Sequence, residues 1–243
     1  MISPHKIRAR NAGFFSALAL VSAGLWTASA FQQQGVHPLT GRHIAGVCGA
    51  GPCATWLERP EREQEENPDG AVDALNLKPG MVVADVGAGT GYMSLKLAKK
   101  VGQGGRVYAE DVQPEMLEKV RANAAKAGMN NIQTVQGTLT DPKLPKAQID
   151  LVLLVDVYHE FSEPQKMLQG IRESLKPDGR LVLLEYRKED PNVPIIAEHK
   201  MSVAEVKTEL EAEGFVLGPV IESLPRQHIL ILTKAGAAKA AGR

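Results

Sequence analysis

The residues best suited to chemistry begin with three glycines at alternate positions, Gly87, Gly89 and Gly91. They follow the apolar run Val82–Val86, which has the composition of a buried parallel strand, and they precede apolar residues at helical spacing over Tyr92–Lys100. Glycine lets the backbone bend tightly and, having no Cβ, lets a ligand lie directly against the main chain. This order of strand, glycine turn and helix predicts a nucleotide-binding βα unit.

The glycine spacing separates two classes of ligand. Dinucleotide enzymes use G-x-G-x-x-G, whereas this sequence has G-x-G-x-G with Tyr92 at the usual third glycine position. The carboxylate of Asp85 before the turn would repel a pyrophosphate but attract a ligand that carries an ammonium and a sulfonium group. The segment DVGAGTGY therefore resembles motif I of the class I S-adenosylmethionine (SAM) methyltransferases, with an NAD-binding loop as the alternative. The resemblance implies cofactor contacts from Asp85, Gly87, Ala88, Gly89, Gly91 and Tyr92.

A second acidic position ends the next strand pattern, Arg106–Asp111. Asp111 lies about 20 residues beyond the glycine loop, where such folds place a carboxylate on the ribose hydroxyls. The adjacent Glu110 makes the choice ambiguous, but resemblance to the methyltransferase pattern V-Y-A-x-D favours Asp111, followed by Val112 as a further cofactor contact. The alternative is a solvated acid at a strand end.

The segment Gly137-Thr138-Leu139 departs from the family pattern. The family often has an acidic residue here that contacts the adenine amine, but Thr138 is neutral and Asp141 comes later. Thr138 and Leu139 are still predicted as cofactor contacts, and the way in which adenine is recognised stays open.

The fourth strand pattern ends in the sequence DVYHEF, which by position faces the transferred methyl group. Asp156 matches the family residue that supports the cofactor. His159 is the candidate general base because its unperturbed pKa lies near neutrality. Glu160 is predicted to orient it or to contact substrate, and Tyr158 is a further catalytic candidate. The alternative is that Tyr158, His159 and Phe161 pack as a cap under a loop.

No metal site is predicted. Methyl transfer from a sulfonium needs alignment, exclusion of water and sometimes removal of a proton, but no compulsory metal. The sequence HEFSE does not match the zinc motif H-E-x-x-H. Cys48 and Cys53 with His43 make a poor ligand set, and the two cysteines are predicted to be either a disulfide or free thiols.

The N-terminus has the three parts of a secretory signal peptide: cations at Lys6, Arg8 and Arg10, an apolar run over Gly13–Trp26, and the small residues Ala28-Ser29-Ala30. Cleavage there predicts a periplasmic or secreted protein, and an uncleaved membrane anchor is the alternative. Cleavage would leave 25 basic residues (28 minus 3) against 28 acidic ones. The whole chain has zero formal net charge and no basic run, which argues against a dedicated nucleic-acid surface.

The 243 residues suffice for one α/β domain with extensions. Strands and helices alternate, which predicts an α/β fold with a doubly wound, mostly parallel, seven-stranded sheet. The last two strands have no helix between them and are predicted to form a C-terminal antiparallel hairpin, which a plain dinucleotide fold lacks. The predicted strands are Val82–Val86, Arg106–Asp111, Ile132–Gln136, Ile149–Val155, Arg180–Tyr186, Phe215–Leu224 and His228–Thr233.

Local signals set further boundaries. Ser162 is predicted to cap a helix that runs to about Leu175, before a turn at 176–179. Ser202 and Glu205 form a capping box.

The charged run Glu58–Glu66 is most simply a solvated helix face, and a cover over the cofactor pocket is the alternative. The loop 185–200 is predicted as an acceptor lid or a charged surface loop. The predicted divisions are a signal peptide (1–30), an extension with a leading helix (31–70), a SAM-binding methyltransferase domain (71–233) and a disordered tail (234–243).

The ordered motifs between about Leu75 and Leu232 resemble methyltransferase type 11 domains, a group that includes small-molecule methylating enzymes. The resemblance implies a SAM-dependent methyltransferase with a small-molecule acceptor. A SAM- or nucleotide-binding module without turnover is the second hypothesis, and an NAD-dependent oxidoreductase the third. The oligomeric state stays open.

Overall fold

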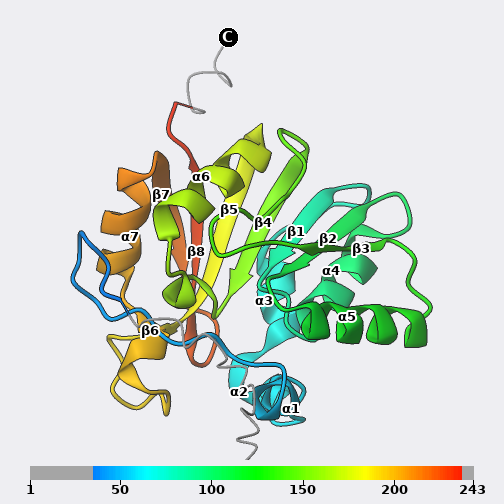
Figure 1. Ribbon diagram of the computed structural model, residues 1–243, viewed down its shortest axis with the longest axis horizontal. Coiled ribbons are helices and arrows are strands. Elements are labelled where there is room, and N and C mark those ends of the chain that lie inside the picture. The colour runs from blue at the N-terminus through cyan, green and yellow to red at the C-terminus, as the bar shows by residue number, and fades with distance from the viewer. Residues whose placement is uncertain (1–34, 237–243) are drawn as a thin grey trace, which may run out of the picture. The chain divides into compact units, whose positions relative to one another are not determined.

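One mixed sheet organises the protein, whose computed structural model describes residues 35–236 (Figure 1). The strands run in the order β3-β2-β1-β4-β5-β8-β7. Strands β1 to β5 pair in parallel, whereas β8 is antiparallel to both β5 and β7. The strands are β1 (Val82–Val86), β2 (Arg106–Asp111), β3 (Ile132–Gln136), β4 (Ile149–Val155), β5 (Leu175–Arg187), β6 (Lys200–Met201), β7 (Phe215–Ile221) and β8 (Gln227–Lys234). The predicted fold class and hairpin are confirmed, but the predicted seven strands miss the two-residue β6, which pairs with β5.

Helices cover both faces of the sheet, as a doubly wound fold requires (Figure 1). On one face lie α3 (Pro68–Ala74), α4 (Tyr92–Val101) and α5 (Pro114–Lys126), and on the other lie α6 (Pro164–Ser174) and α7 (Val203–Ala212). Two short helices, α1 (Pro52–Leu57) and α2 (Arg62–Glu66), precede them, and single 3-10 turns occupy Tyr158–Glu160 (η1) and Ala197–His199 (η2).

The apolar composition of β4 explains its central position. Successive side chains of a strand point to opposite faces, so Leu151 and Leu153 enter one core while Val152 and Leu154 enter the other. β4 pairs with β1 on the side opposite β2, so the strand order reverses between β1 and β4. The crevice at the carboxyl ends of the strands at such a reversal is where open α/β sheets bind ligands.

Three local expectations need correction. Glu163, not Ser162, is the N-cap residue of α6, and no side chain caps this helix. The turn expected at 176–179 lies within β5, where the pairing with β4 passes from Ile149↔Leu175 to Leu151↔Arg180 and leaves four residues out of register. β7 ends at Ile221 rather than at Leu224. The Ser202–Glu205 capping box is confirmed, with both reciprocal bonds present.

The predicted signal peptide lies outside the described residues. The predicted tail overlaps the sheet at its start, because Lys234 ends β8 and its Nζ donates to the Leu175 carbonyl at 2.8 Å. The rest of the tail from residue 237 lies outside the description. Between residues 35 and 236, no helix has the length and apolar character needed to cross a bilayer.

Candidate active site

A cavity of about 550 Å³ opens at the carboxyl ends of β1, β2, β4 and β5, next to the reversal in strand order. Its volume falls in the range typical of small-molecule and cofactor sites. The predicted site residues that line it are Gly87, Gly89, Asp111, Val112, Thr138, Leu139, Asp156, His159 and Glu160. Residues of η1, η2 and the N-terminal extension complete the wall.

The glycine loop presents bare backbone to this cavity. Gly87 and Gly89 have φ values of 72° and 54°, in the left-handed region that favours glycine. A Cβ on Gly87 would come within 2.5 Å of Val157, and one on Gly89 within 2.8 Å of Leu57. Both positions therefore need glycine for their backbone conformation, and Gly87 also needs it for lack of space, whereas the atom nearest Gly89 is the end of a movable leucine side chain.

Asp111 fixes the loop against the start of α5. One carboxylate oxygen accepts from the Gly89 N–H at 2.9 Å, and the other accepts from the Gln113 N–H at 2.8 Å. Burial raises the pKa of Asp111, and these backbone N–H bonds oppose the shift. The carboxylate lies where the sequence placed it, at the end of β2 and on the cavity wall.

Glu110 also lines the cavity, although the sequence argument favoured only its neighbour. Its Oε2 accepts from the Gly87 N–H at 3.3 Å, while its buried Oε1 has no hydrogen-bond partner within the described part of the chain. Gly137 makes room for the carboxyl group, since a Cβ there would lie 1.8 Å from Oε1. Burial and the adjacent Asp111 charge raise the pKa of Glu110 to about 8. The adjacent acids in the sequence were the available signal: both face the site.

Asp156 is a second carboxyl group with an unused oxygen. It follows β4 with a φ of 53°, and its Oδ2 accepts from the Gln227 Nε2 at 2.7 Å. Its Oδ1 is buried and has no partner among the described residues. Burial, with the nearby Glu66 and Glu185 charges, raises the pKa of Asp156 well above its usual value.

Five of the predicted residues do not line the cavity. Asp85 lies beneath the glycine loop, where it accepts from the Ser94 hydroxyl at 2.6 Å and where burial raises its pKa to about 6. Tyr92 instead bonds Glu63 through its hydroxyl. Tyr158 was predicted as a catalytic candidate, but its hydroxyl donates to Glu209 at 2.8 Å within the core, and the ring does not line the cavity. Ala88 and Gly91 complete this group.

His159 is held by a buried carboxylate that the sequence argument did not select. Its Nδ1 lies 2.7 Å from Glu185 Oε2, and its Nε2 lies 3.1 Å from His199 Nδ1. Burial alone would lower the pKa of His159, but Glu185 raises it above the usual value. Glu160 does not orient His159 as one prediction held; its Oε1 accepts from the Cys48 N–H at 3.1 Å. His159, Glu160 and Phe161 line the cavity whereas Tyr158 does not, and the catalytic role of His159 stays a prediction.

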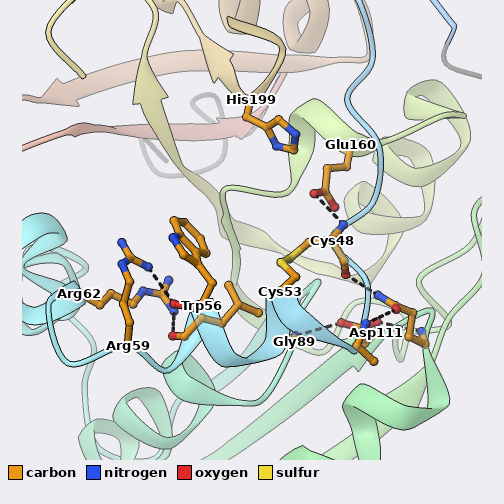
Figure 2. Close-up of a disulfide and its surroundings, with 12 residues drawn as sticks. Cys48, Cys53, Trp56, Arg59, Arg62, Gly89, Asp111, Glu160 and His199 are labelled. Atoms are coloured by element: carbon orange, nitrogen blue, oxygen red, sulfur yellow. Dashed lines mark hydrogen bonds between the residues drawn. A yellow bond between two sulfur atoms is a disulfide. The ribbon is translucent and has the colours of Figure 1, made fainter. Parts of the chain in front are cut away.

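The N-terminal extension covers the site. Cys48 and Cys53 are joined in a disulfide, which lines the cavity with Trp56 and Leu57 of α1 (Figure 2). Gln113 holds the start of the disulfide loop, because its Nε2 donates to the Cys48 carbonyl at 2.9 Å and its Oε1 accepts from the Ala50 N–H at 3.1 Å. The pocket cover was predicted for the run Glu58–Glu66, of which only Arg62 lines the cavity, and the segment that contributes most of this wall is residues 46–57.

The charged run after α1 is only partly solvated. Arg62 and Glu66 are 5% and 2% exposed, and Arg62 Nε donates to Glu66 at 2.6 Å. Arg62 also lines the cavity and donates to the Leu57 carbonyl at 3.0 Å. The prediction of a solvated helix face is therefore wrong for these two residues, because their mutual charge compensation allows them to be buried.

The arrangement divides the cavity into two ends. Backbone from the glycine loop and the carboxyl groups of Glu110, Asp111 and Asp156 form a polar, acidic end. The other end combines imidazoles with apolar side chains. Its walls are His159, Glu160, His199, Phe161, Met167 and Ile195. The loop after β5 therefore contributes to the cavity wall, and its role as an acceptor lid stays a prediction.

Comparison with known proteins places most of the chain in a recognised group. Residues 77–226 match the family described as "Methyltransferase domain". The ubiquinone/menaquinone biosynthesis C-methyltransferase UbiE of Vibrio vulnificus (strain YJ016) is 30% identical over 118 residues, covering 48% of this chain and 45% of that protein. A protein-L-isoaspartate O-methyltransferase of Methanothrix thermoacetophila is 32% identical over 111 residues, which cover 46% of this chain and 50% of that protein. The chain spans about half the length of these curated relatives.

A solved structure extends the similarity over more of the chain. A SAM dependent methyltransferase from Aquifex aeolicus superposes with a TM-score of 0.69 at 31% sequence identity. The superposition covers 74% of this chain and 95% of that one.

Proposed function

The chain belongs to the methyltransferase domain family, and from that premise we propose that it transfers a methyl group from S-adenosylmethionine to a small-molecule acceptor. One observation carries this proposal. The backbone of Gly87 and Gly89 meets three carboxyl groups in one cavity, and two of these groups have a buried oxygen without a partner in the described chain.

The residues present suit this cofactor. An adenosyl sulfonium carries amines, ribose hydroxyls and a positive sulfur, all of which carboxyl groups can bind. Asp111 would hold the ribose, while Glu110 and Thr138 would border the adenine with Val112 and Leu139. Asp156 would support the amino group, and the Arg62 guanidinium in the same wall would attract the methionyl carboxylate. When bound, SAM supplies a methyl group already activated for transfer.

The chain's own part in the reaction is to align the acceptor and exclude water. The extension and the loop after β5 both line the cavity, so the acceptor would react under a cover. Phe161, Met167 and Ile195 would contact its apolar body, and the imidazole of His159 would contact its reactive atom. Such a closed, mixed site favours a small molecule over a nucleic acid, in keeping with the absence of a basic run in the sequence.

We further propose that the protein acts outside the cytoplasm. The N-terminal sequence has the pattern of a signal peptide, and the disulfide between Cys48 and Cys53 suits an oxidising compartment. A fusion of residues 1–40 to a reporter enzyme that is active only after export would test this placement.

Turnover is tested by S-adenosylhomocysteine formation from SAM in the presence of panels of phenols, quinols, amines and thiols. Formation that depends on one acceptor class, and that is lost in Asp111→Asn, would support the proposal. SAM binding without product on any panel would favour the binding module. Oxidation of NADH without SAM consumption would favour the oxidoreductase.

A further inference from the structure

Two histidines from distant segments converge on one side of the cavity, with a carboxylate beside them. His159 lies in η1 and His199 in η2, and His159 Nε2 is 3.1 Å from His199 Nδ1. Glu160 joins the two histidines: one possible ligand atom from each of the three residues lies within 4.8 Å of the other two. Figure 2 shows Glu160 and His199 on the same side of the Cys48–Cys53 disulfide. We infer that His159, Glu160 and His199 bind a divalent transition-metal ion at the acceptor end of the cavity.

The spacing of the two nitrogens suits a shared ion. Two imidazole nitrogens, each about 2.0–2.1 Å from a tetrahedral zinc ion, stand about 3.3 Å apart. The observed 3.1 Å is close to that separation. The two rings meet edge to face, with 72° between their planes, so they are not stacked on each other. The same distance also fits a direct imidazole–imidazole hydrogen bond, and zinc titration distinguishes that bond from a metal site.

Glu185 supports the metal-binding tautomer of His159. A histidine that binds a metal usually donates its other ring N–H to a carboxylate or a carbonyl. Glu185 Oε2 lies 2.7 Å from His159 Nδ1, and Glu185 is fully buried. A neutral His159 that donates from Nδ1 to Glu185 would leave its Nε2 lone pair directed at His199. The other Glu185 oxygen accepts from the Tyr158 N–H at 3.0 Å, which fixes the carboxylate in place.

The set of donors matches a reactive metal site rather than a purely structural one. Two histidines and one carboxylate are the protein ligands of some catalytic zinc sites and of non-haem iron(II) sites, which keep a position open. All three residues line the cavity, so the open position would face the acceptor. This part of the inference rests on the proposed function. A bound ion would polarise an acceptor oxygen or nitrogen, and the Nε2 of His159 would then be a ligand rather than the predicted general base.

Zinc binding tests the site directly. The full chain is treated with a chelator, dialysed, and titrated with ZnCl₂ by calorimetry in the absence of SAM. One ion should bind per chain. His199→Ala should lower the affinity by more than about 100-fold, because loss of a direct ligand should cost at least as much as loss of a second-shell partner. His43→Ala is the matched control, since His43 is exposed and lies outside the cavity; its affinity should equal that of the wild type.

Glu185→Gln provides an independent readout. The glutamine amide facing Nδ1 would favour the tautomer with its proton on Nε2, so zinc affinity should fall about 10–100-fold. A thermal melt monitors the folding of each variant. If His199→Ala does not fold, His199→Gln is measured in its place. No zinc binding by the folded wild type, or equal binding by folded His199 variants, would overturn the inference. SAM binding by the metal-free protein is measured separately, so failure of the metal site is distinguishable from failure of the proposed function.

Discussion

The buried Glu110 should make the stability of the protein fall as the pH rises, and Glu110→Gln should remove the part of that fall that Glu110 contributes. Its carboxyl group has a pKa near 8 in the folded protein, compared with a reference value of 4.5. Burial is the main cause, and the negative charges that face it are Asp111 on β2, Asp85 on β1 and Asp141 after β3. The Gly87 N–H bond opposes the shift without cancelling it.

The sign follows from proton binding. Between the two pKa values the folded protein holds a proton on Glu110 that the unfolded chain has released, so unfolding becomes more favourable as the pH rises. The contribution is fully present below about pH 4.5 and is lost as the pH approaches about 8. At about 1.36 kcal/mol for each pH unit over this interval, the loss amounts to at most about 5 kcal/mol.

The assay is urea denaturation of wild type and Glu110→Gln from about pH 5 to about pH 9. Glutamine preserves the acceptor for the Gly87 N–H but does not ionise. The free energy of unfolding of the wild type should therefore decline relative to the variant over this range, by several kcal/mol. Exposed Glu118 on α5 supplies the control, and Glu118→Gln should follow the wild type. A difference between wild type and Glu110→Gln that stays constant with pH would refute the reasoning.

Two further perturbations test how the extension is held. Glu209 is fully buried and accepts hydrogen bonds from the Arg42 Nε at 2.9 Å and from the Tyr158 hydroxyl. Glu209→Ala should lower the free energy of unfolding by about 3–5 kcal/mol, because it leaves the Arg42 charge buried and unpaired. An unchanged urea midpoint would contradict that role. Reduction of the Cys48–Cys53 disulfide, or replacement of both cysteines by serine, should lower the free energy of unfolding by about 2 kcal/mol, as the loop-entropy relation gives for so short a loop. It should also weaken SAM binding, because the cavity wall beside Leu57 becomes less ordered. Calorimetry with and without reductant checks this, and an identical SAM affinity would show that the disulfide does not order the site.

The sheet was predictable because its signals are local. The strands β1 to β4 have the predicted bounds. For β1 and β4 the reason is that buried parallel strands have near-continuous apolar sequences between turn residues. The Ser202–Glu205 capping box could be predicted from the sequence as well, because both residues lie within one helical turn. Ser162 shows the limit of such signals: its residue type suits a cap, but the chain enters α6 one residue later.

The site was less predictable because its contacts join distant segments. His159 and Glu185 are separated by 26 residues, and His159 and His199 by 40, so spacing alone does not pair them. The adjacent acids Glu110 and Asp111 are visible in the sequence, but the space that Gly137 leaves for the Glu110 carboxyl group is a contact between distant segments. The cavity that both carboxyl groups line exists only in the folded protein. The burial of Arg62 could not be predicted either, because a run of charged residues indicates solvent exposure unless the ion pair that compensates the buried charge is known.

The central claim is that the cavity beside the glycine loop binds SAM. The most direct measurement is calorimetric titration of the full chain with SAM, S-adenosylhomocysteine and NADH, using Gly89→Ala and the control Gly104→Ala. A Cβ at Gly89 would meet Leu57 at 2.8 Å, whereas the nearest atom at Gly104 is 3.9 Å away. We expect both adenosyl ligands to bind the wild type and Gly104→Ala, with binding greatly weakened in Gly89→Ala and no binding of NADH. Absence of adenosyl binding by the folded wild type, or full affinity in Gly89→Ala, would contradict the account.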